Sequence, residues 1–81
     1  MKKNEFIKEI VEYCELEGSG IQMNTEFRSI EGYDSMAVLS LIAFADEKFG
    51  IRLTSKQIYS LTDLESYVTL IGKNKFDDEW S

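Results

Sequence analysis

The stretch from Met36 to Ala45 constrains the fold of this chain more than any other. It reads MAVLSLIAFA, in which Ser40 is the one polar residue among ten. A helix that is apolar nearly all round must lie at the centre of a fold or keep part of its surface for a ligand or partner. The chain has 81 residues, enough for one domain with one hydrophobic core. We therefore expect a single domain over residues 1–81, built around a helix that begins near Asp34.

A first helix is predicted between Asn4 and the triplet Gly18-Ser19-Gly20. Apolar residues fall at 3- and 4-residue spacing from Phe6 to Cys14, while charged residues take the opposite face. Asn4 is the candidate N-cap, and the glycines are expected to end the helix. Residues 18–33 show no sustained period and predict a long loop, which in so small a domain is often functional.

Capping signals define the rest of the chain. Gly50 is expected to end the central helix in a left-handed conformation, with Ile51 folding back onto the last turn. Thr54-Ser55-Lys56-Gln57 and Thr62-Asp63-Leu64-Glu65 both have the capping-box spacing, which marks the start of a helix. They predict a short third helix and an amphipathic fourth helix that stops at Gly72.

Together these segments predict an all-α fold. It is a small four-helix bundle with a long loop between the first and second helices and a short third helix. The helical core is expected over about residues 4–72. Residues 73–81 are expected to form a mobile tail, in which Phe76 and Trp80 dock weakly at most.

Composition excludes several classes of function. Histidine is absent, so no Ser-His-Asp or Cys-His arrangement can form, and we expect neither catalytic residues nor a metal site. The net charge of −6 disfavours a nucleic-acid partner and favours basic protein surfaces. Cys14 is the single cysteine and no segment approaches the ~20 apolar residues of a membrane span. The chain is therefore expected to be a cytoplasmic monomer that is not an enzyme and does not bind membranes.

The order of these elements, with Gly32-Tyr33-Asp34-Ser35-Met36 opening the apolar helix, resembles the acyl carrier protein family over roughly residues 4–72. Asp34-Ser35-Met36 is similar to the Asp-Ser-Leu of that family, with methionine in place of leucine. Phe27 stands where the family's loop has an aromatic anchor. Residues 47–51 resemble the close of the family's second helix.

The resemblance implies that a separate phosphopantetheinyl transferase attaches 4′-phosphopantetheine from coenzyme A to Ser35. The chain would then hold acyl intermediates as thioesters and present them to partner enzymes. Asp34 would help the transferase and its magnesium engage the site. A phosphodiester at a helix N-terminus also meets free N–H groups and the positive end of the helix dipole. Asp-Ser before an apolar helix is, however, also what simple N-capping requires.

The family's second helix usually carries a ladder of acids that meets basic patches on partner enzymes. Here the intermediate positions are Ala37 and Ser40. Fatty acid synthesis is therefore one possible pathway, and a dedicated lipid, polysaccharide or secondary-metabolite pathway is another. Apolar contacts are expected to supplement the remaining acids. The residues expected to recognise partners are Asp34, Met36, Asp46, Glu47 and Ile51.

The apolar excess of the central helix predicts a pocket that shelters part of an acyl chain between the helices. The expected lining is Val38, Leu39, Ile42, Phe49, Ile58, Leu61 and Val68.

Two alternatives remain open from the sequence. Within the carrier class, the alternative is an aminoacyl or peptidyl cargo, including D-alanyl, because such carriers can also have an Asp-Ser-Met setting. Outside that class, an unmodified helical module could use the apolar helix to bind another protein.

Overall fold

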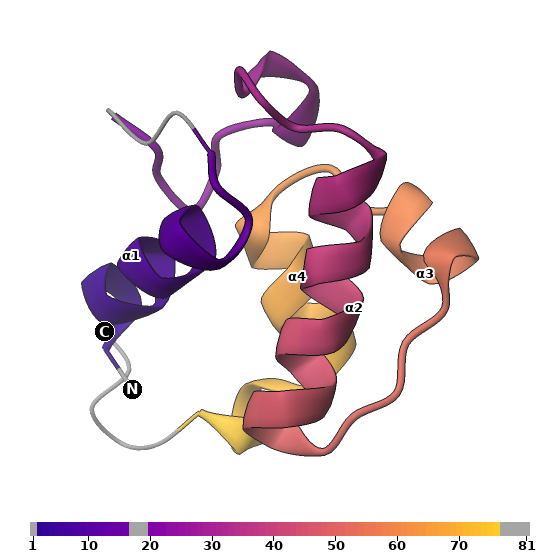
Figure 1. Ribbon diagram of the computed structural model, residues 1–81. Helices are drawn as coiled ribbons and strands as arrows, with labels where there is room; N and C mark the ends of the chain where they lie inside the picture. Colours follow the sequence, from indigo (N-terminus) through magenta and orange to yellow (C-terminus); the bar gives the residue numbers. More distant parts are fainter. Residues whose placement is uncertain (1, 17–19, 77–81) are drawn as a thin grey trace.

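A computed structural model describes residues 2–16 and 20–76, and the only regular elements in that part are helices, joined by loops and turns (Figure 1). The prediction of an all-α domain with four helices, the third of them short, is confirmed for these residues. The helices are α1 (Lys3–Tyr13), α2 (Ser35–Phe49), α3 (Ser55–Tyr59) and α4 (Leu64–Ile71). Two short 3-10 turns accompany them, η1 (Phe27–Ser29) and η2 (Lys73–Lys75).

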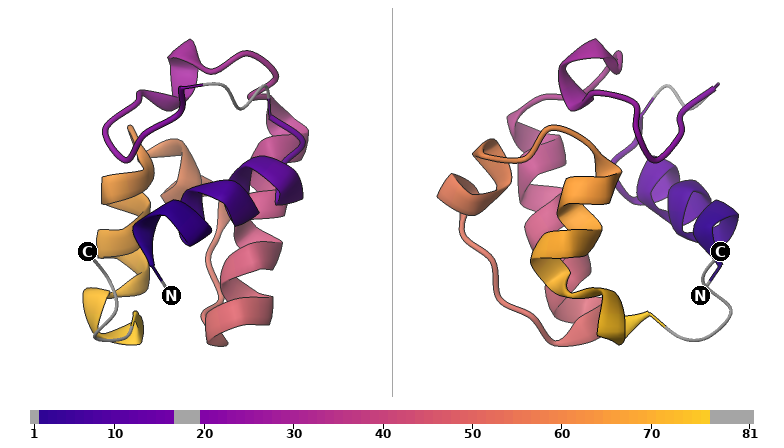
Figure 2. Two further views of the ribbon diagram at one scale, coloured as in Figure 1. Left: turned by 90° about the vertical axis from the view of Figure 1, so that its left-hand side faces the viewer. Right: turned by 180° about the vertical axis from the view of Figure 1, so that it is seen from behind.

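Helix α2 lies at the centre, with α3 on one side of it and α1 on the other (Figure 1). Helix α1 runs across α2 and α4 rather than alongside them (Figure 2). The central position accounts for the apolar sequence of α2, which buries Ala37, Val38, Leu41, Phe44 and Ala45. The same helix also keeps apolar side chains on the surface, since Met36 is 67% exposed and Leu39 is 57% exposed.

All four helices contribute to one core. The ring of Phe6 from α1 lies 5.9 Å from that of Phe44 in α2 and 6.2 Å from that of Tyr67 in α4. Ile58 of α3 is fully buried in the same cluster. Aromatic pairs of this kind add about 0.5–1.5 kcal/mol each beyond the area they bury. Phe6 of α1 is therefore the residue whose ring packs against both α2 and α4 in the core.

Helix α1 ends before the glycines that were expected to end it. Glu15 takes a left-handed conformation with φ 53°, and the Leu16 N–H then donates to the Val11 carbonyl at 3.0 Å. This is the Schellman arrangement, here without a glycine. Burial of Leu16 provides the physical reason, because the turn brings that side chain into the core. Gly18 and Ser19 lie outside the described residues.

Asn4 is not the N-cap of α1. Lys2 occupies that position without a side-chain cap, and the Asn4 Oδ1 accepts only from the neighbouring Glu5 N–H.

The capping box of α3 is confirmed, and that of α4 is shifted by one residue. The Gln57 N–H donates to Thr54 Oγ1 at 3.2 Å, and the Thr54 N–H donates to Gln57 Oε1 at 2.9 Å. In α4 the cap is Asp63 rather than Thr62, and its partner is Ser66 rather than Glu65. A carboxylate accepts a backbone N–H more strongly than a hydroxyl does, which favours Asp63 as the cap.

The fold continues past α4 to Phe76. That ring lies 5.4 Å from Phe6 and 4.8 Å from Phe49, and the residue is 6% exposed. Phe76 is thus packed into the core between α1 and the end of α2, while the three residues of η2 before it are exposed. Trp80 lies outside the described residues.

Candidate functional site

Ser35 is the first residue of α2 and is exposed. The carboxylate of Asp34 caps the helix, accepting from the Met36 N–H at 3.0 Å and the Ala37 N–H at 3.1 Å. The Ser35 side chain makes no hydrogen bond with any residue that the structure describes. Helix capping therefore explains why an aspartate stands at position 34, but it does not explain the serine at position 35.

The loop before Ser35 is held in place by aromatic stacking. The rings of Phe27 and Tyr33 are 4.9 Å apart and nearly parallel, with an angle of 4° between their planes. Gly32 has φ 91°, a conformation that disfavours a side chain and lets the chain turn between these residues. The Phe27 N–H also donates to the Thr62 carbonyl at 2.8 Å. Ser35 is thus exposed at the N-terminus of a long helix, directly after a loop that these contacts hold in place.

Electrostatics at this end of α2 favour an anionic group. Unpaired N–H groups and the aligned peptide dipoles put partial positive charge at a helix N-terminus, which stabilises a nearby anion by about 0.3–1 kcal/mol. The carboxylate of Asp34 already accepts hydrogen bonds from two of these N–H groups. A phosphodiester on Ser35 would lie in the same region of positive potential.

The residues expected to recognise partners do not form one patch. Asp34 and Met36 stand at the start of α2, and Asp46 and Glu47 are exposed near its end. With a rise of about 1.5 Å per residue, the two groups lie roughly 16 Å apart along the helix. Ile51 is half-buried after the helix, and its N–H donates to the Ala45 carbonyl at 3.2 Å, as its predicted fold-back requires.

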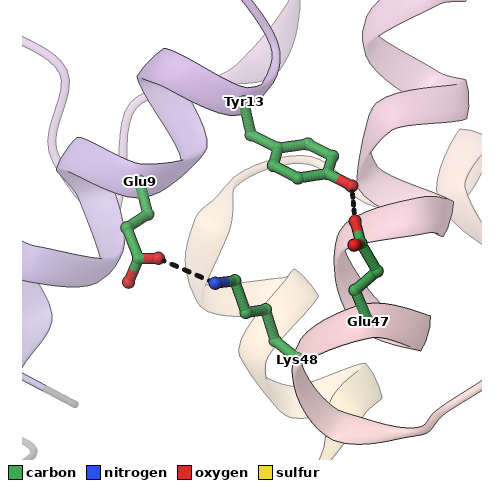
Figure 3. Close-up of polar contacts among 4 residues, drawn as sticks. All are labelled: Glu9, Tyr13, Glu47 and Lys48. Atoms are coloured by element: carbon green, nitrogen blue, oxygen red, sulfur yellow. Dashed lines mark hydrogen bonds and ion pairs between the residues drawn. The ribbon is translucent and has the colours of Figure 1, made fainter.

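Glu47 is engaged within the domain, which the sequence did not reveal. The hydroxyl of Tyr13 in α1 donates a hydrogen bond to its carboxylate (Figure 3). This bond raises the pKa of Tyr13, because a phenolate would lose the bond and be repelled by the carboxylate. On the next residue, Lys48 Nζ lies 3.4 Å from Glu9 Oε1 (Figure 3). These polar contacts tie the last turn of α2 to α1.

The two positions of α2 that lack an acid, Ala37 and Ser40, differ in how exposed they are. Ala37 is 1% exposed, so an acid there would be a buried charge and could not meet a partner. Ser40 is half-buried and is the position where an acid could stand at the surface.

The residues expected to line an acyl pocket are only partly gathered. Val38, Ile58 and Val68 are buried in the core cluster. Three more are half-buried against it, namely Ile42, Phe49 and Leu61. Leu39 is 57% exposed and belongs to the outer face of α2. Consecutive residues of a helix point in directions about 100° apart, which separates Leu39 from its neighbour Val38.

Among residues 2–16 and 20–76, no group of three or more acidic, cysteine or histidine side chains is placed to hold a metal ion. In the same part of the chain, no helix has both the length and the apolar composition needed to cross a membrane.

A comparison with known protein families gives a match over a range that includes the exposed Ser35. A family model described as the phosphopantetheine attachment site matches residues 4–71. No curated protein and no solved structure matches the chain. The family match covers most of the sequence, including α1, α2, α3 and α4. The chain therefore belongs to the phosphopantetheine attachment site family, whose members are carrier domains that bear 4′-phosphopantetheine covalently.

Proposed function

We propose that this protein carries an acyl group as a thioester on 4′-phosphopantetheine attached to Ser35, and that it presents this group to partner enzymes without catalysing a reaction itself. The observation that carries the proposal is the exposed and unengaged hydroxyl of Ser35 beside a capping Asp34. The hydroxyl would attack the pyrophosphate of coenzyme A in the transferase, forming the phosphodiester and releasing adenosine 3′,5′-bisphosphate.

Intact mass spectrometry tests the attachment site. The apo protein is incubated with coenzyme A and a promiscuous phosphopantetheinyl transferase, and one phosphopantetheinyl group should be added. Ser35→Ala should gain none. Ser40→Ala is the matched control, because Ser40 lies in the same helix and is half-buried, and it should be modified like the wild type.

Other outcomes would change the proposal. Modification of Ser35→Ala at another serine would reject the assignment of the site. A wild-type protein that is never modified would favour an unmodified interaction module.

The proposed partners are the transferase and enzymes that load, elongate or transfer the acyl group. Asp34, Asp46 and Glu47 would orient basic docking patches on these enzymes, while Met36 and Ile51 would add apolar contact. The surface acids of α2 are few, and this supports a dedicated lipid, polysaccharide or secondary-metabolite pathway over general fatty acid synthesis.

For the cargo, we propose that an acyl chain enters between α2, α3 and α4 by displacing the half-buried Ile42 and Leu61. It would reach Val38, Ile58 and Val68 behind them, with Phe49 at the far end and Leu39 left outside. Burial contributes about 25 cal/mol per Å² of apolar area, so a medium acyl chain should raise the melting temperature above that of the protein with the bare arm.

Amide chemical shifts of the lining residues provide the second readout of the cargo. Unchanged shifts and an unchanged melting temperature would instead favour a short or polar cargo, including an aminoacyl or D-alanyl group.

A further inference from the structure

An open hollow of about 640 Å³ lies beside the start of α1. Three segments line it: Lys2, Lys3 and Ile7 come from the start of α1, Met23 comes from the loop between α1 and α2, and Glu65 comes from the first turn of α4. The Glu65 N–H donates to the Met23 carbonyl at 3.1 Å, which ties this loop to α4. The hollow is therefore held open by contacts between distant parts of the chain.

The lining combines cations with apolar surface. Among the described residues that line it, Lys2 and Lys3 oppose one acid, Glu65, so the hollow has a formal charge of +1 in a chain whose net charge is −6. Ile7 and Met23 are half-buried and pack against the core. A segment that has both acids and a large apolar side chain would match both parts of this lining.

The chain carries such a segment directly after the described residues. Residues 77–81 read Asp-Asp-Glu-Trp-Ser, three acids followed by the one tryptophan of the protein. The acids can pair with the two lysines. Trp80 offers a large apolar ring, which makes favourable contacts with the sulfur of a methionine such as Met23, and an indole N–H that needs an acceptor. Gln22 and Asn24 also line the hollow, and their side-chain amides have acceptor oxygens.

The position of Phe76 brings this segment within reach of the hollow. The ring of Phe76 lies 5.4 Å from that of Phe6 in α1. The Phe6 N–H donates to the Lys2 carbonyl at 2.9 Å, so Lys2 stands one turn of α1 before Phe6. The four residues from Phe76 to Trp80 span up to about 14 Å when extended. Trp80 can therefore reach the hollow while Phe76 stays in the core.

We propose that residues 77–81 dock in this hollow, with their acids paired to the two lysines and the Trp80 ring on the apolar part of the lining. Weak contacts suffice, because the packed phenylalanine before the segment keeps its effective concentration near the hollow high. A partner protein with an acidic segment would have to displace residues 77–81 before it could use Lys2 and Lys3. The contact does not depend on a group attached to Ser35.

Tryptophan fluorescence tests the proposal, because Trp80 is the one tryptophan of the chain. In the folded protein its emission should lie at a shorter wavelength than in urea, and acrylamide should quench it severalfold less. Lys2→Glu/Lys3→Glu should move both values toward those measured in urea. Added salt should have the same effect on the wild type, since it screens ion pairs. Circular dichroism checks that the variant is folded.

The matched control is Lys8→Glu/Lys56→Glu, which makes the same change of charge at exposed residues that do not line the hollow. It should leave the emission and the quenching as in the wild type. If Trp80 is quenched equally in the folded wild type and in urea, or if the two double variants behave alike, the segment does not dock in the hollow. Shielding of Trp80 that arises only when a partner enzyme is added would also reject the proposal. These results need no modified protein, so they are separate from the test of Ser35.

Discussion

The phenol of Tyr67 in α4 donates a 2.5 Å hydrogen bond to the backbone carbonyl oxygen of Leu41 in α2. Tyr67 is fully buried and Leu41 is 1% exposed, so this bond satisfies a polar atom within the core. It joins the fourth helix to the central one without a charged group.

Tyr67→Phe should therefore lower the free energy of unfolding by about 1 kcal/mol, the usual net contribution of such a bond. The ring and its packing on Phe6 remain, so a large cavity is not created. Urea denaturation at neutral pH measures the change. Tyr59→Phe makes the same chemical change at a 68% exposed position and should stay within about 0.5 kcal/mol of the wild type. Equal stabilities for the two variants would show that the buried bond contributes nothing.

Stability should also decline at alkaline pH. Burial raises the pKa of the Cys14 thiol from 9.0 to about 12, and burial likewise raises the pKa of Tyr67. Above pH 9 the unfolded chain loses the thiol proton while the folded chain keeps it, so the free energy of unfolding falls. The thiol's contribution is fully present below pH 9 and is lost as the pH rises toward 12.

Urea denaturation at a series of pH values checks this dependence. Each such group contributes a slope of at most about 1.4 kcal/mol per pH unit. Cys14→Ala should be less stable at neutral pH, because it leaves a small cavity, but its stability should fall less steeply above pH 9 than that of the wild type. Parallel curves would mean that the thiol is not the group responsible.

The two roles of Asp34 can be separated by paired substitutions. Asp34→Ala removes the cap of α2 and should lower the free energy of unfolding by about 1 kcal/mol, whereas Asp34→Asn keeps a capping oxygen and should be nearly neutral. If the charge assists the transferase, Asp34→Asn should still be modified more slowly than the wild type. Stability from thermal melts and modification rates from intact mass provide the two measurements. Wild-type rates for Asp34→Asn would restrict this residue to capping.

Docking of the modified protein should depend more on Met36 than on the acids at the far end of α2. Exposed charge pairs contribute about 0–1 kcal/mol each and are screened beyond roughly 8–10 Å at physiological salt. Met36 is 67% exposed and adjoins the attachment site, so it can become a buried anchor. Met36→Ala should weaken binding to the transferase or loading enzyme more than Asp46→Asn/Glu47→Gln, with little effect of added salt.

Titration calorimetry at low and moderate salt compares these variants. Because Glu47 also accepts from Tyr13, Tyr13→Phe serves as a control for any loss of contact between α1 and α2. If the double charge variant and added salt abolish binding while Met36→Ala leaves it intact, the interface is electrostatic.

The sequence by itself determined the features that depend on neighbouring residues. Periodicity placed the apolar stripe of α4, and Gly50 ends α2 with φ 68°, as its position after Phe49 predicted. The capping box at Thr54 and the helix start at Ser35 follow from hydrogen bonds within a few residues. Short-range signals of this kind need no knowledge of the rest of the fold.

Only the tertiary structure decided where the chain is held by distant contacts. Glu15 adopts a left-handed turn because Leu16 is drawn into the core, and Phe76 joins that core through Phe6 and Phe49. The bond from Tyr13 to Glu47 spans 34 residues of sequence, and the Phe27 N–H bonds to the Thr62 carbonyl across a stretch of similar length. Such contacts arise from the packing of whole elements, and the spacing of residues along the chain does not encode which pair will meet.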